Sequence, residues 1–291
     1  MTHSTDPSSW VAVITGASRG LGRGMAIALG RLGASVYVTG RRHSDSSWSG
    51  TLEDTVAAIN QAGGTGIAVA CDHADDAQTE ALFAEVKQRH GRLDILVNNA
   101  FAMPDWAAAH GRFWERPLDL WRQVVDVGTR SSYTASAFAV PLMLPSGRGL
   151  IVNTSGRGAR VYLHGLPYGV GKAGQDKLAY DMAHELRPFG IAAVSFWCGL
   201  LQTDRTLAAI AKNPEHYADR GGTDCVESPE MIGAVTGRLY QDPRLMEMSG
   251  GTYYTAELAN YYGVLEPDGR RPVSFRSRFG APLFETFKLA P

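Results

Sequence analysis

A tyrosine and a lysine four residues apart, Tyr168 and Lys172, stand at the start of a long amphipathic stretch. On an α-helix this spacing puts the phenol and the ammonium on the same face. A neighbouring positive charge favours the phenolate, so we expect Lys172 to lower the pKa of Tyr168 from about 10 by about 1 to 3 units. The pair is therefore a candidate for general acid or base chemistry near neutral pH.

Ser155 precedes this pair, at the end of an apolar run that is typical of a buried strand. Its hydroxyl would lie beside the phenol and could hold a substrate carbonyl oxygen there. The other interpretation is a serine at a strand end that bonds the backbone. Ser155 does not resemble a hydrolase nucleophile, because the segment NTSGRG lacks the GxSxG turn.

A glycine-rich segment, TGASRGLG at residues 15–22, joins the first apolar run to a helical pattern. Its glycines permit a tight turn and allow backbone N–H groups to approach a pyrophosphate at a helix N-terminus. A strand before the segment and a helix after it distinguish a dinucleotide site from an ordinary turn. The sequence therefore predicts cofactor contacts from Gly16, Ser18, Arg19, Gly20, Leu21 and Gly22.

The end of the second apolar run indicates which nicotinamide cofactor binds. An acidic residue there would bind a ribose 2′-hydroxyl, whereas arginine suits the 2′-phosphate of NADP(H). This run ends in Arg41 and Arg42 without a carboxylate, and Arg19 could reach the same phosphate. We expect NADP(H) to be favoured over NAD(H), unless these arginines are merely solvated. Asp72, after the third run, could bind the adenine amino group or cap the next helix.

Apolar runs of strand length alternate with longer stretches of helical period from Trp10 past residue 250. This alternation predicts an α/β fold: a doubly wound Rossmann domain with a seven-stranded parallel sheet and helices on both faces. We expect a single domain over residues 1–291, with a core of about 10–255 and a C-terminal extension of about 256–291. The predicted strands are 10–15, 35–40, 66–71, 94–99, 149–155, 191–197 and 251–255. The predicted helices include 21–32, 75–89, 118–144 and 168–187.

The composition excludes several classes of protein. The 291 residues carry 28 lysines and arginines against 29 aspartates and glutamates, a formal net charge of -1, with no basic stripe for a nucleic acid. Three cysteines lie far apart and no histidine has ligand spacing, so neither a disulfide framework nor a metal site is indicated. No signal peptide or run of about 18 apolar residues is present, and we therefore expect a cytoplasmic protein without a membrane span.

The glycine-rich segment, the serine and the tyrosine–lysine pair occur along the chain in an order that resembles the short-chain dehydrogenase/reductase family. TGASRGLG is similar to the family's TGxxxGxG loop, and NNA at residues 98–100 is similar to its NNAG segment. Ser155, Tyr168 and Lys172 match its serine, tyrosine and lysine, and Thr203 matches a threonine that contacts the nicotinamide amide. The resemblance covers about residues 10–255. Similarity to one subgroup within the family extends over residues 121–133, 168–187, 200–204 and 266–272.

The resemblance implies an oxidoreductase that interconverts a carbonyl and an alcohol. Tyr168 would act as the general acid or base, and Ser155 would orient the carbonyl oxygen. Lys172 would tune Tyr168 and also bind the nicotinamide ribose. Further cofactor contacts would come from Asn98 and Thr203.

The loops after the fourth, fifth and sixth predicted strands carry many aromatic and apolar side chains. They favour reduction of a bulky apolar ketone or aldehyde, and they contain Phe101, Met103, Trp106, Phe113, Trp114, Tyr162, His164, Leu200, Leu201 and Tyr217. Arg157 and Arg160 could instead attract an acidic substrate. The alternatives are a hydroxysteroid or alcohol dehydrogenase that works mainly in oxidation, and an NADP(H)-binding sensor or scaffold with little turnover.

The resemblance also implies an assembly of copies of the chain. Stretches 118–144 and 168–187 are similar to the helices through which family members pair, so we expect a homodimer or a homotetramer. The extension after about residue 256 carries several aromatic residues. These could cover the pocket, contact a second subunit or rest on a membrane surface.

Three positions depart from the family pattern. Gly128 stands where the family has an asparagine that helps to hold a proton-relay water, and its backbone carbonyl could bind that water instead. Phe101 replaces the last glycine of NNAG and could narrow the surroundings of the cofactor. Cys198 replaces the proline before Gly199, which must then turn without proline's fixed angle. We expect a modified relay rather than an inactive enzyme.

Overall fold

The strands of the main sheet are formed by the apolar runs that the sequence singles out. The computed structural model describes residues 6, 9–41, 50–102, 111–218 and 225–289. Every residue of the four central strands is buried, as expected for strands covered on both faces. All seven predicted strands are confirmed: β1 Val11–Ile14, β2 Ser35–Gly40, β3 Thr65–Ala70, β4 Ile95–Asn98, β5 Gly149–Ser155, β6 Ile191–Trp197 and β9 Thr252–Tyr254.

The strand order is β3-β2-β1-β4-β5-β6-β9, and every neighbouring pair is parallel. The predicted doubly wound sheet is therefore confirmed. Because β1 pairs with both β2 and β4, the strand order reverses at β1. Sheets of this type bind ligands at the carboxyl ends of the strands beside such a switch point. The loops that leave β1 and β4 there contain residues 15–20 and 99–102.

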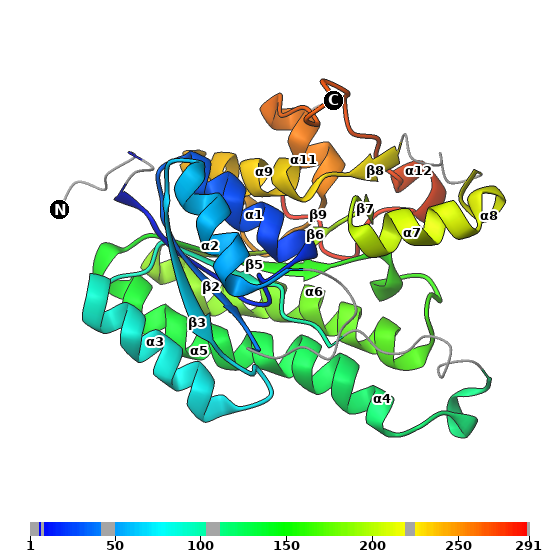
Figure 1. The fold of residues 1–291 in the computed structure, drawn as a ribbon, viewed down its shortest axis with the longest axis horizontal. Coiled ribbons are helices and arrows are strands. Elements are labelled where there is room, and N and C mark those ends of the chain that lie inside the picture. The colour runs from blue at the N-terminus through cyan, green and yellow to red at the C-terminus, as the bar shows by residue number, and fades with distance from the viewer. Residues whose placement is uncertain (1–5, 7–8, 42–49, 103–110, 219–224, 290–291) are drawn as a thin grey trace.

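Helices cover both faces of the sheet (Figure 1). One face carries α1 Gly20–Arg31, α2 Leu52–Gln61, α9 Pro229–Gln241 and α11 Thr255–Tyr262. The opposite face carries α3 Asp76–His90, α5 Ser131–Met143 and α6 Leu166–Leu186. The buried apolar side chains accordingly form two main clusters, one between the sheet and each helical layer. The shorter helical pieces are α10 Leu245–Met248, η2 Phe113–Glu115, η5 Arg157–Ala159 and η6 Arg187–Phe189.

The helix predicted at 118–144 exists, but it is not uniform. It begins as α4 Asp119–Trp121 and continues as a π-helical segment, η3 Arg122–Arg130, before α5 and a final 3₁₀ turn, η4 Leu144–Ser146. π-Helical turns are rare and are frequently found at functional sites. Hydrophobic periodicity does not reveal which backbone hydrogen-bonding pattern a helix adopts, so the sequence predicted one continuous helix.

Short elements follow β6. β7 Leu200–Leu201 pairs in parallel with β8 Val226–Glu227, and α7 Asp204–Lys212 and α8 Pro214–Ala218 lie between them. The C-terminal extension completes α11 and then adds one short helix, α12 Arg276–Phe279. The extension therefore has defined structure through most of its length.

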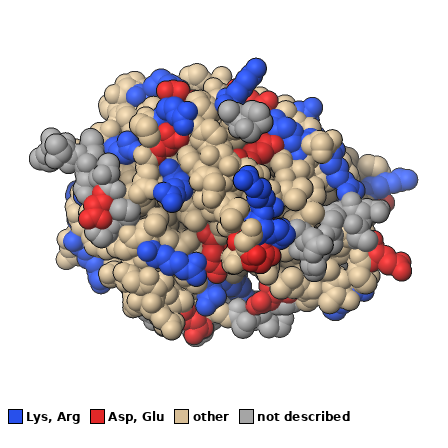
Figure 2. Space-filling view, turned by 90° about the horizontal axis from the view of Figure 1, so that it is seen from above, with Lys and Arg blue, Asp and Glu red and all other residues tan. Residues whose placement is uncertain are grey.

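The surface has two properties that bear on binding partners. None of the helices in the described ranges is long and apolar enough to cross a membrane. On the face shown in Figure 2, lysines and arginines are interspersed with aspartates and glutamates. Mixed charges of this kind produce no extended basic field over that face.

Helices α1 and α9 pack in close contact through glycines. A Cβ built at Gly233 would lie 2.6 Å from the Cβ of Ala28 and 2.6 Å from the Cα of Met25, and one at Gly24 would lie 2.2 Å from the Cβ of Pro229. Ordinary carbon–carbon contacts are about 3.5 to 4.0 Å. The contact fixes α1, whose N-terminus follows the glycine-rich segment.

We expect Gly233→Ala to destabilise the protein by about 1 to 3 kcal/mol, since the added methyl group overlaps the backbone of α1. Helix propensity alone predicts the opposite, a gain of about 1 kcal/mol. Equilibrium unfolding in urea measures the change, with Ala234→Ser as the neighbouring control. A more stable Gly233→Ala protein would show that the two helices are not in such close contact.

Candidate active site

The glycine-rich segment forms a tight turn between β1 and α1. Gly16 and Gly20 have positive φ angles of 65° and 56°, which residues with a Cβ rarely adopt. A Cβ built at Gly22 would lie 2.5 Å from Asn99 Nδ2 and 2.6 Å from the Gly16 carbonyl oxygen. Among the described residues, no side-chain hydrogen bond caps the N-terminus of α1. A close backbone turn at an uncapped helix N-terminus fits the pyrophosphate of a dinucleotide.

Two adjacent asparagines after β4 have different surroundings. Asn99 Nδ2 donates to the Gly16 carbonyl oxygen at 3.0 Å and so ties the glycine-rich turn to β4. Asn98, a predicted cofactor contact, is 2% exposed, and its Nδ2 donates to Ser136 Oγ at 3.0 Å and Asn153 Oδ1 at 2.9 Å. The structure therefore places the Asn98 side chain in the core. Asn99 belongs to the same NNA segment, but the sequence alone did not indicate this contact with the glycine-rich turn.

Three arginines gather beside the glycine-rich turn. Burial, followed by repulsion from Arg205 and Arg41, lowers the pKa of Arg19, so both of these guanidinium groups act on that of Arg19. Arg41 follows β2 directly, and Arg205 lies in the first turn of α7. Like charges held together favour the binding of an anion. The sequence did not predict Arg205, which is distant along the chain, and Arg42 lies outside the described residues.

Other predicted cofactor residues lie around the same edge of the sheet. A Cβ built at Gly40, the last residue of β2, would lie 3.8 Å from Ser18 Oγ. A Cβ built at Gly20 would lie 3.7 Å from Thr203 Cγ2, so the start of α1 faces the start of α7. Leu21 belongs to the core below the turn, which leaves its backbone as the part available to a cofactor.

Asp72 takes part in a local turn after β3. Its Oδ1 accepts a hydrogen bond from the Ala74 N–H at 3.0 Å. The helix-capping role that the sequence left open for Asp72 belongs to Asp75, whose side chain accepts from two N–H groups at the start of α3. Contact between Asp72 and an adenine ring stays a prediction.

The structure brings Ser155, Tyr168 and Lys172 together at the carboxyl edge of the sheet. Tyr168 and Lys172 lie one turn apart on α6, and Ser155 is the last residue of β5. Ser155 Oγ donates to the Lys172 carbonyl oxygen at 3.0 Å, and Lys172 Nζ donates to the Thr154 carbonyl oxygen at 3.1 Å. The backbone bond considered for Ser155 therefore exists, and a substrate oxygen would compete for the same hydroxyl.

Burial raises the pKa of Tyr168 to about 12, opposite to the direction that the sequence predicted. Desolvation disfavours the phenolate and outweighs the attraction of nearby positive charge. The strongest such attraction comes from Arg157 and not from Lys172. Lys172 Nζ lies 5.8 Å from the centre of the Tyr168 ring and donates to Thr154, while burial lowers its own pKa. The expected lowering of the Tyr168 pKa by Lys172 is therefore not observed.

A buried carboxylate that the sequence analysis missed lies below the site. Asp176, one helical turn after Lys172, accepts hydrogen bonds from Ser195 Oγ at 2.6 Å and Trp197 Nε1 at 2.8 Å. Burial raises the pKa of Asp176 to about 6, although these donors, Ser155 and the charge of Lys172 oppose that increase. Asp176 thus joins α6 to β6 beneath the catalytic residues. Its position four residues after Lys172 was the available sequence signal.

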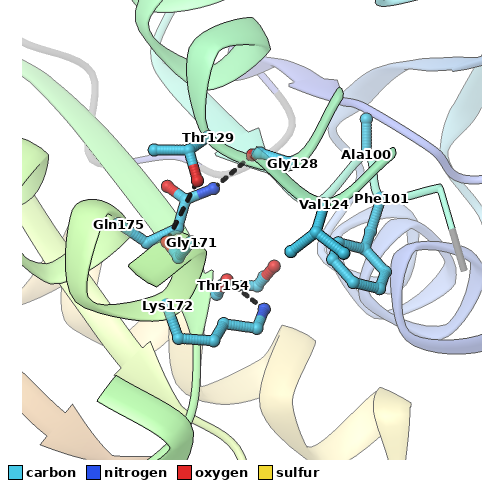
Figure 3. Close-up of a pocket in the computed structure, with 9 residues that line it drawn as sticks. All are labelled: Ala100, Phe101, Val124, Gly128, Thr129, Thr154, Gly171, Lys172 and Gln175. Carbon is cyan, nitrogen blue, oxygen red and sulfur yellow. Dashed lines mark hydrogen bonds between the residues drawn. The ribbon is translucent and has the colours of Figure 1, made fainter. Parts of the chain in front are cut away.

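The ring of Phe101 fills the space that a larger side chain would need at Gly128 (Figure 3). A Cβ built at Gly128 would lie 3.1 Å from Phe101 Cδ2, closer than an ordinary contact of about 3.5 Å. The ring also packs against Leu120 and Val124, and Lys172 Nζ lies 5.2 Å from its centre. Two of the departures from the family pattern are therefore parts of one packing arrangement.

The carbonyl of Gly128 is bonded to two side chains. It accepts hydrogen bonds from Gln175 Nε2 at 2.5 Å and from Ser132 Oγ at 3.0 Å. A carbonyl oxygen has two lone pairs, so a relay water would compete with these donors for it, and its bond to such a water stays a prediction. A cavity of about 10 Å³, lined in part by Lys172 and Gln175, lies beside it (Figure 3). This volume is near the minimum for one water molecule.

A buried glutamate holds the turn that follows β6. The Gly199 N–H donates to Glu227 Oε2 at 3.1 Å, and the Thr255 hydroxyl donates to the same carboxylate. A Cβ built at Gly199 would lie 2.6 Å from Glu227 Oε1. Glu227 thus fixes the turn in place of the proline that Cys198 replaces. Burial raises the pKa of Glu227 to about 7.

Two of the predicted pocket residues approach Tyr168. The rings of Phe101 and His164 lie edge-on to the Tyr168 ring, with centres 6.4 Å and 5.1 Å away. Three others are 61%, 63% and 81% exposed and form an outer surface: Phe113, Trp114 and Tyr162. The pocket residues outside the described part of the chain are Met103 and Trp106.

Residues 10–213 match the family model of the short chain dehydrogenases. Together with the parallel sheet and the glycine-rich turn, this match shows that the chain belongs to the short-chain dehydrogenase/reductase family. It is an oxidoreductase that acts on CH–OH and C=O groups of small molecules, and its family uses NAD(P)(H).

The chain is similar to dehydrogenase/reductase SDR family member 1 of Mus musculus, with 40% identity over 287 residues, 96% of this chain and 90% of the relative. The Homo sapiens protein of the same name is 39% identical over 268 residues, 89% of this chain and 84% of the relative. This is the subgroup that the sequence predicted. A crystal structure of a short-chain alcohol dehydrogenase candidate from Sinorhizobium meliloti superposes with a TM-score of 0.72 at 24% identity, over 86% of this chain and 96% of that one. At that identity it supports the fold alone.

We expect Phe101 and Gly128 to be energetically coupled. Gly128→Asn alone should destabilise the protein by about 1 to 3 kcal/mol, because the new side chain meets the Phe101 ring. In the Phe101→Ala background the same substitution should cost at least about 1 kcal/mol less. A double-mutant cycle from urea unfolding measures this coupling, and strictly additive free energies would contradict it.

Proposed function

We propose that this oxidoreductase is an NADPH-dependent reductase of a bulky apolar ketone or aldehyde. Its catalytic residues would be Ser155, Tyr168 and Lys172. The observation that carries the proposal is the meeting of a phenol and an ammonium on α6 with a serine at the end of β5, beside a turn shaped for a dinucleotide.

The preference for the phosphorylated cofactor is supported by Arg19, Arg41 and Arg205. Burial and then repulsion from Arg205 and Arg41 lower the pKa of Arg19, and an anion bound among the three side chains would relieve that repulsion. A guanidinium binds phosphate through two parallel hydrogen bonds. No carboxylate ends β2, where a site for the unphosphorylated cofactor usually has one.

The reaction needs one proton for each hydride. When bound, the reduced nicotinamide supplies the hydride to the carbonyl carbon. The Ser155 hydroxyl would turn from the Lys172 backbone to the substrate oxygen, where negative charge develops. Tyr168 would give its phenolic proton to the same oxygen, and its phenolate would then take a proton from solvent. The positive charge of Arg157 favours that phenolate, and Lys172 would bind the nicotinamide ribose.

The surroundings of Tyr168 support an apolar substrate. The phenol is flanked by the rings of Phe101 and His164, so a carbonyl group beside it would enter between aromatic faces and edges. An acidic substrate has less support. Arg157 lies against aromatic rings, and Arg160 donates to the Ala281 carbonyl.

A second copy of the chain would complete the assembly. We propose a homodimer or homotetramer whose interface is the surface of α4, α5 and α6. Several large apolar side chains on this surface are more than a third exposed. Exposed apolar groups concentrated on neighbouring helices are typical of an interface. They include Leu118, Trp121, Tyr133, Leu166 and Val170.

We expect Tyr168→Phe to lower kcat/KM by about 10² to 10⁴-fold, because the proton donor is lost while the ring is kept. The affinity for NADPH should stay nearly unchanged. The measurement is NADPH oxidation with a panel of aliphatic, aromatic and steroidal carbonyl compounds, paired with fluorescence titration of NADPH. Full activity in Tyr168→Phe would contradict the mechanism.

The same panel separates the alternatives. Turnover that is faster with the corresponding alcohols and NADP⁺ would favour a dehydrogenase that works in oxidation. Tight NADPH binding with no turnover in either direction would favour a sensor or scaffold.

We expect Arg41→Asp and Arg205→Asp each to weaken NADPH binding by about 10 to 100-fold, since each removes a charge-assisted hydrogen bond to phosphate. Binding of NADH should change far less. Arg31→Asp, at the opposite end of α1, is the matched control. Equal losses for NADPH and NADH would remove the assignment of the 2′-phosphate site.

A further inference from the structure

The C-terminal extension folds back onto the loop that follows β5. The Tyr254 hydroxyl donates to the Gly280 carbonyl oxygen at 2.9 Å, and the Arg160 guanidinium donates to the Ala281 carbonyl oxygen. Residues 275–281, which we call the tail segment, lie beyond the residues that the family model matches. They belong to the C-terminal extension and are placed beside the loop that carries Arg157 and Arg160.

Arg157 of this loop also contacts the tail segment. Its Cζ lies 4.5 Å from the centre of the Phe279 ring and 5.9 Å from that of Phe275. A guanidinium within about 6 Å of an aromatic ring is held by the negative ring face. The side chain of Arg157, which begins η5, is thus positioned by two aromatic rings of the tail segment.

The backbone on either side of Arg157 touches Tyr168. A Cβ built at Gly158 would lie 2.4 Å from Tyr168 Cε1, so the phenol ring packs against that residue. A Cβ built at Gly156 would lie 3.7 Å from the Tyr168 hydroxyl oxygen. The loop from Gly156 to Gly158 therefore lines one side of the phenol, and Arg157 is at its centre.

We propose that the tail segment is part of the catalytic apparatus: Phe275 and Phe279 hold Arg157 as a positioning residue whose charge stabilises the Tyr168 phenolate. This rests on the proposed function of Tyr168 as the acid and base. Arg157 would do this without touching the substrate.

The charges around Tyr168 favour this role for Arg157. Its charge is the largest influence that lowers the pKa of Tyr168 against the effect of burial. Cys198, from the turn after β6, acts in the opposite direction. Lys172 lies on the same helix with its ammonium directed to Thr154, and His164 presents its ring edge-on to the phenol. Among the groups that face Tyr168, Arg157 is therefore the one whose removal should move the titration most.

The test follows the ionisation of Tyr168 directly and needs no turnover. The full-length protein is produced with 3,5-difluorotyrosine, whose phenol ionises at a lower pH, and the ¹⁹F resonance of Tyr168 is assigned by its loss in Tyr168→Phe. We expect Arg157→Met to raise the titration midpoint of that resonance by about one pH unit. Arg157→Lys, which keeps the charge, should restore part of the shift.

The contribution of the tail segment is tested in the same way. Phe279→Leu should raise the midpoint by a smaller amount, because Arg157 loses one of its two aromatic contacts. Phe287→Leu is the matched control: it also removes a tail ring beside an arginine, since Arg244 Cζ lies 5.6 Å from that ring, but it does not reach Tyr168. Circular dichroism checks that each variant is folded. If Arg157→Met does not fold, the comparison of Phe279→Leu with Phe287→Leu still tests the inference.

An unchanged midpoint in both Arg157→Met and Phe279→Leu would overturn the inference, as would equal shifts for Phe279→Leu and Phe287→Leu. Because the resonance titrates whether or not the enzyme turns over, the outcome is separate from that of the proposed function. Shifted midpoints in an active enzyme should be accompanied by an equal shift of the kcat pH profile, with the KM for NADPH unchanged. A shift seen in the ¹⁹F titration alone would place Arg157 beside the phenol but overturn its part in the reaction.

Discussion

A reciprocal pair of hydrogen bonds between β5 and α6 is the constraint on which the active site depends. Ser155 Oγ donates to the Lys172 backbone, and Lys172 Nζ donates to the Thr154 backbone. The two bonds fix the register between a strand end and a helix face, so the phenol of Tyr168 has one defined height above the sheet. Below them, Asp176 joins the same helix to Ser195 and Trp197 of β6. The catalytic side chains are thus placed by contacts among three elements and not by their own helix alone.

Desolvation is the opposing force at this site. The packing that orients Tyr168 also raises its pKa to about 12, so positive charge must offset burial for the phenol to act as an acid and base. Arg157 supplies the largest part of that charge in the structure, and aromatic rings of the C-terminal extension hold it in place. The C-terminal extension can in this way influence the central proton transfer.

The family departures at Phe101 and Gly128 show how a packing change can alter a hydrogen-bond network. The ring of Phe101 crowds the facing position, which is a glycine, and the carbonyl of Gly128 accepts from Gln175 and Ser132. The bond from Gln175 joins the π-helical segment to α6, and the bond from Ser132 lies at its junction with α5. The π-helical segment, Gly128 and the ring of Phe101 thus form one packing arrangement beside Lys172.

The sequence by itself determined that the chain forms a parallel sheet, because the local periodicity of its apolar residues alternates between strands and helices. It also determined that the glycine-rich turn lies near Ser155, Tyr168 and Lys172, because parallel strands end at one edge of the sheet. Tertiary structure alone decided the direction of the Tyr168 pKa, the core position of Asn98, and the parts played by Asn99, Arg205 and Asp176. It also decided the contact of the C-terminal extension with Arg157. Each of these depends on distances between residues far apart in the chain, or on the balance of burial and charge at one atom, and no spacing along the sequence encodes either.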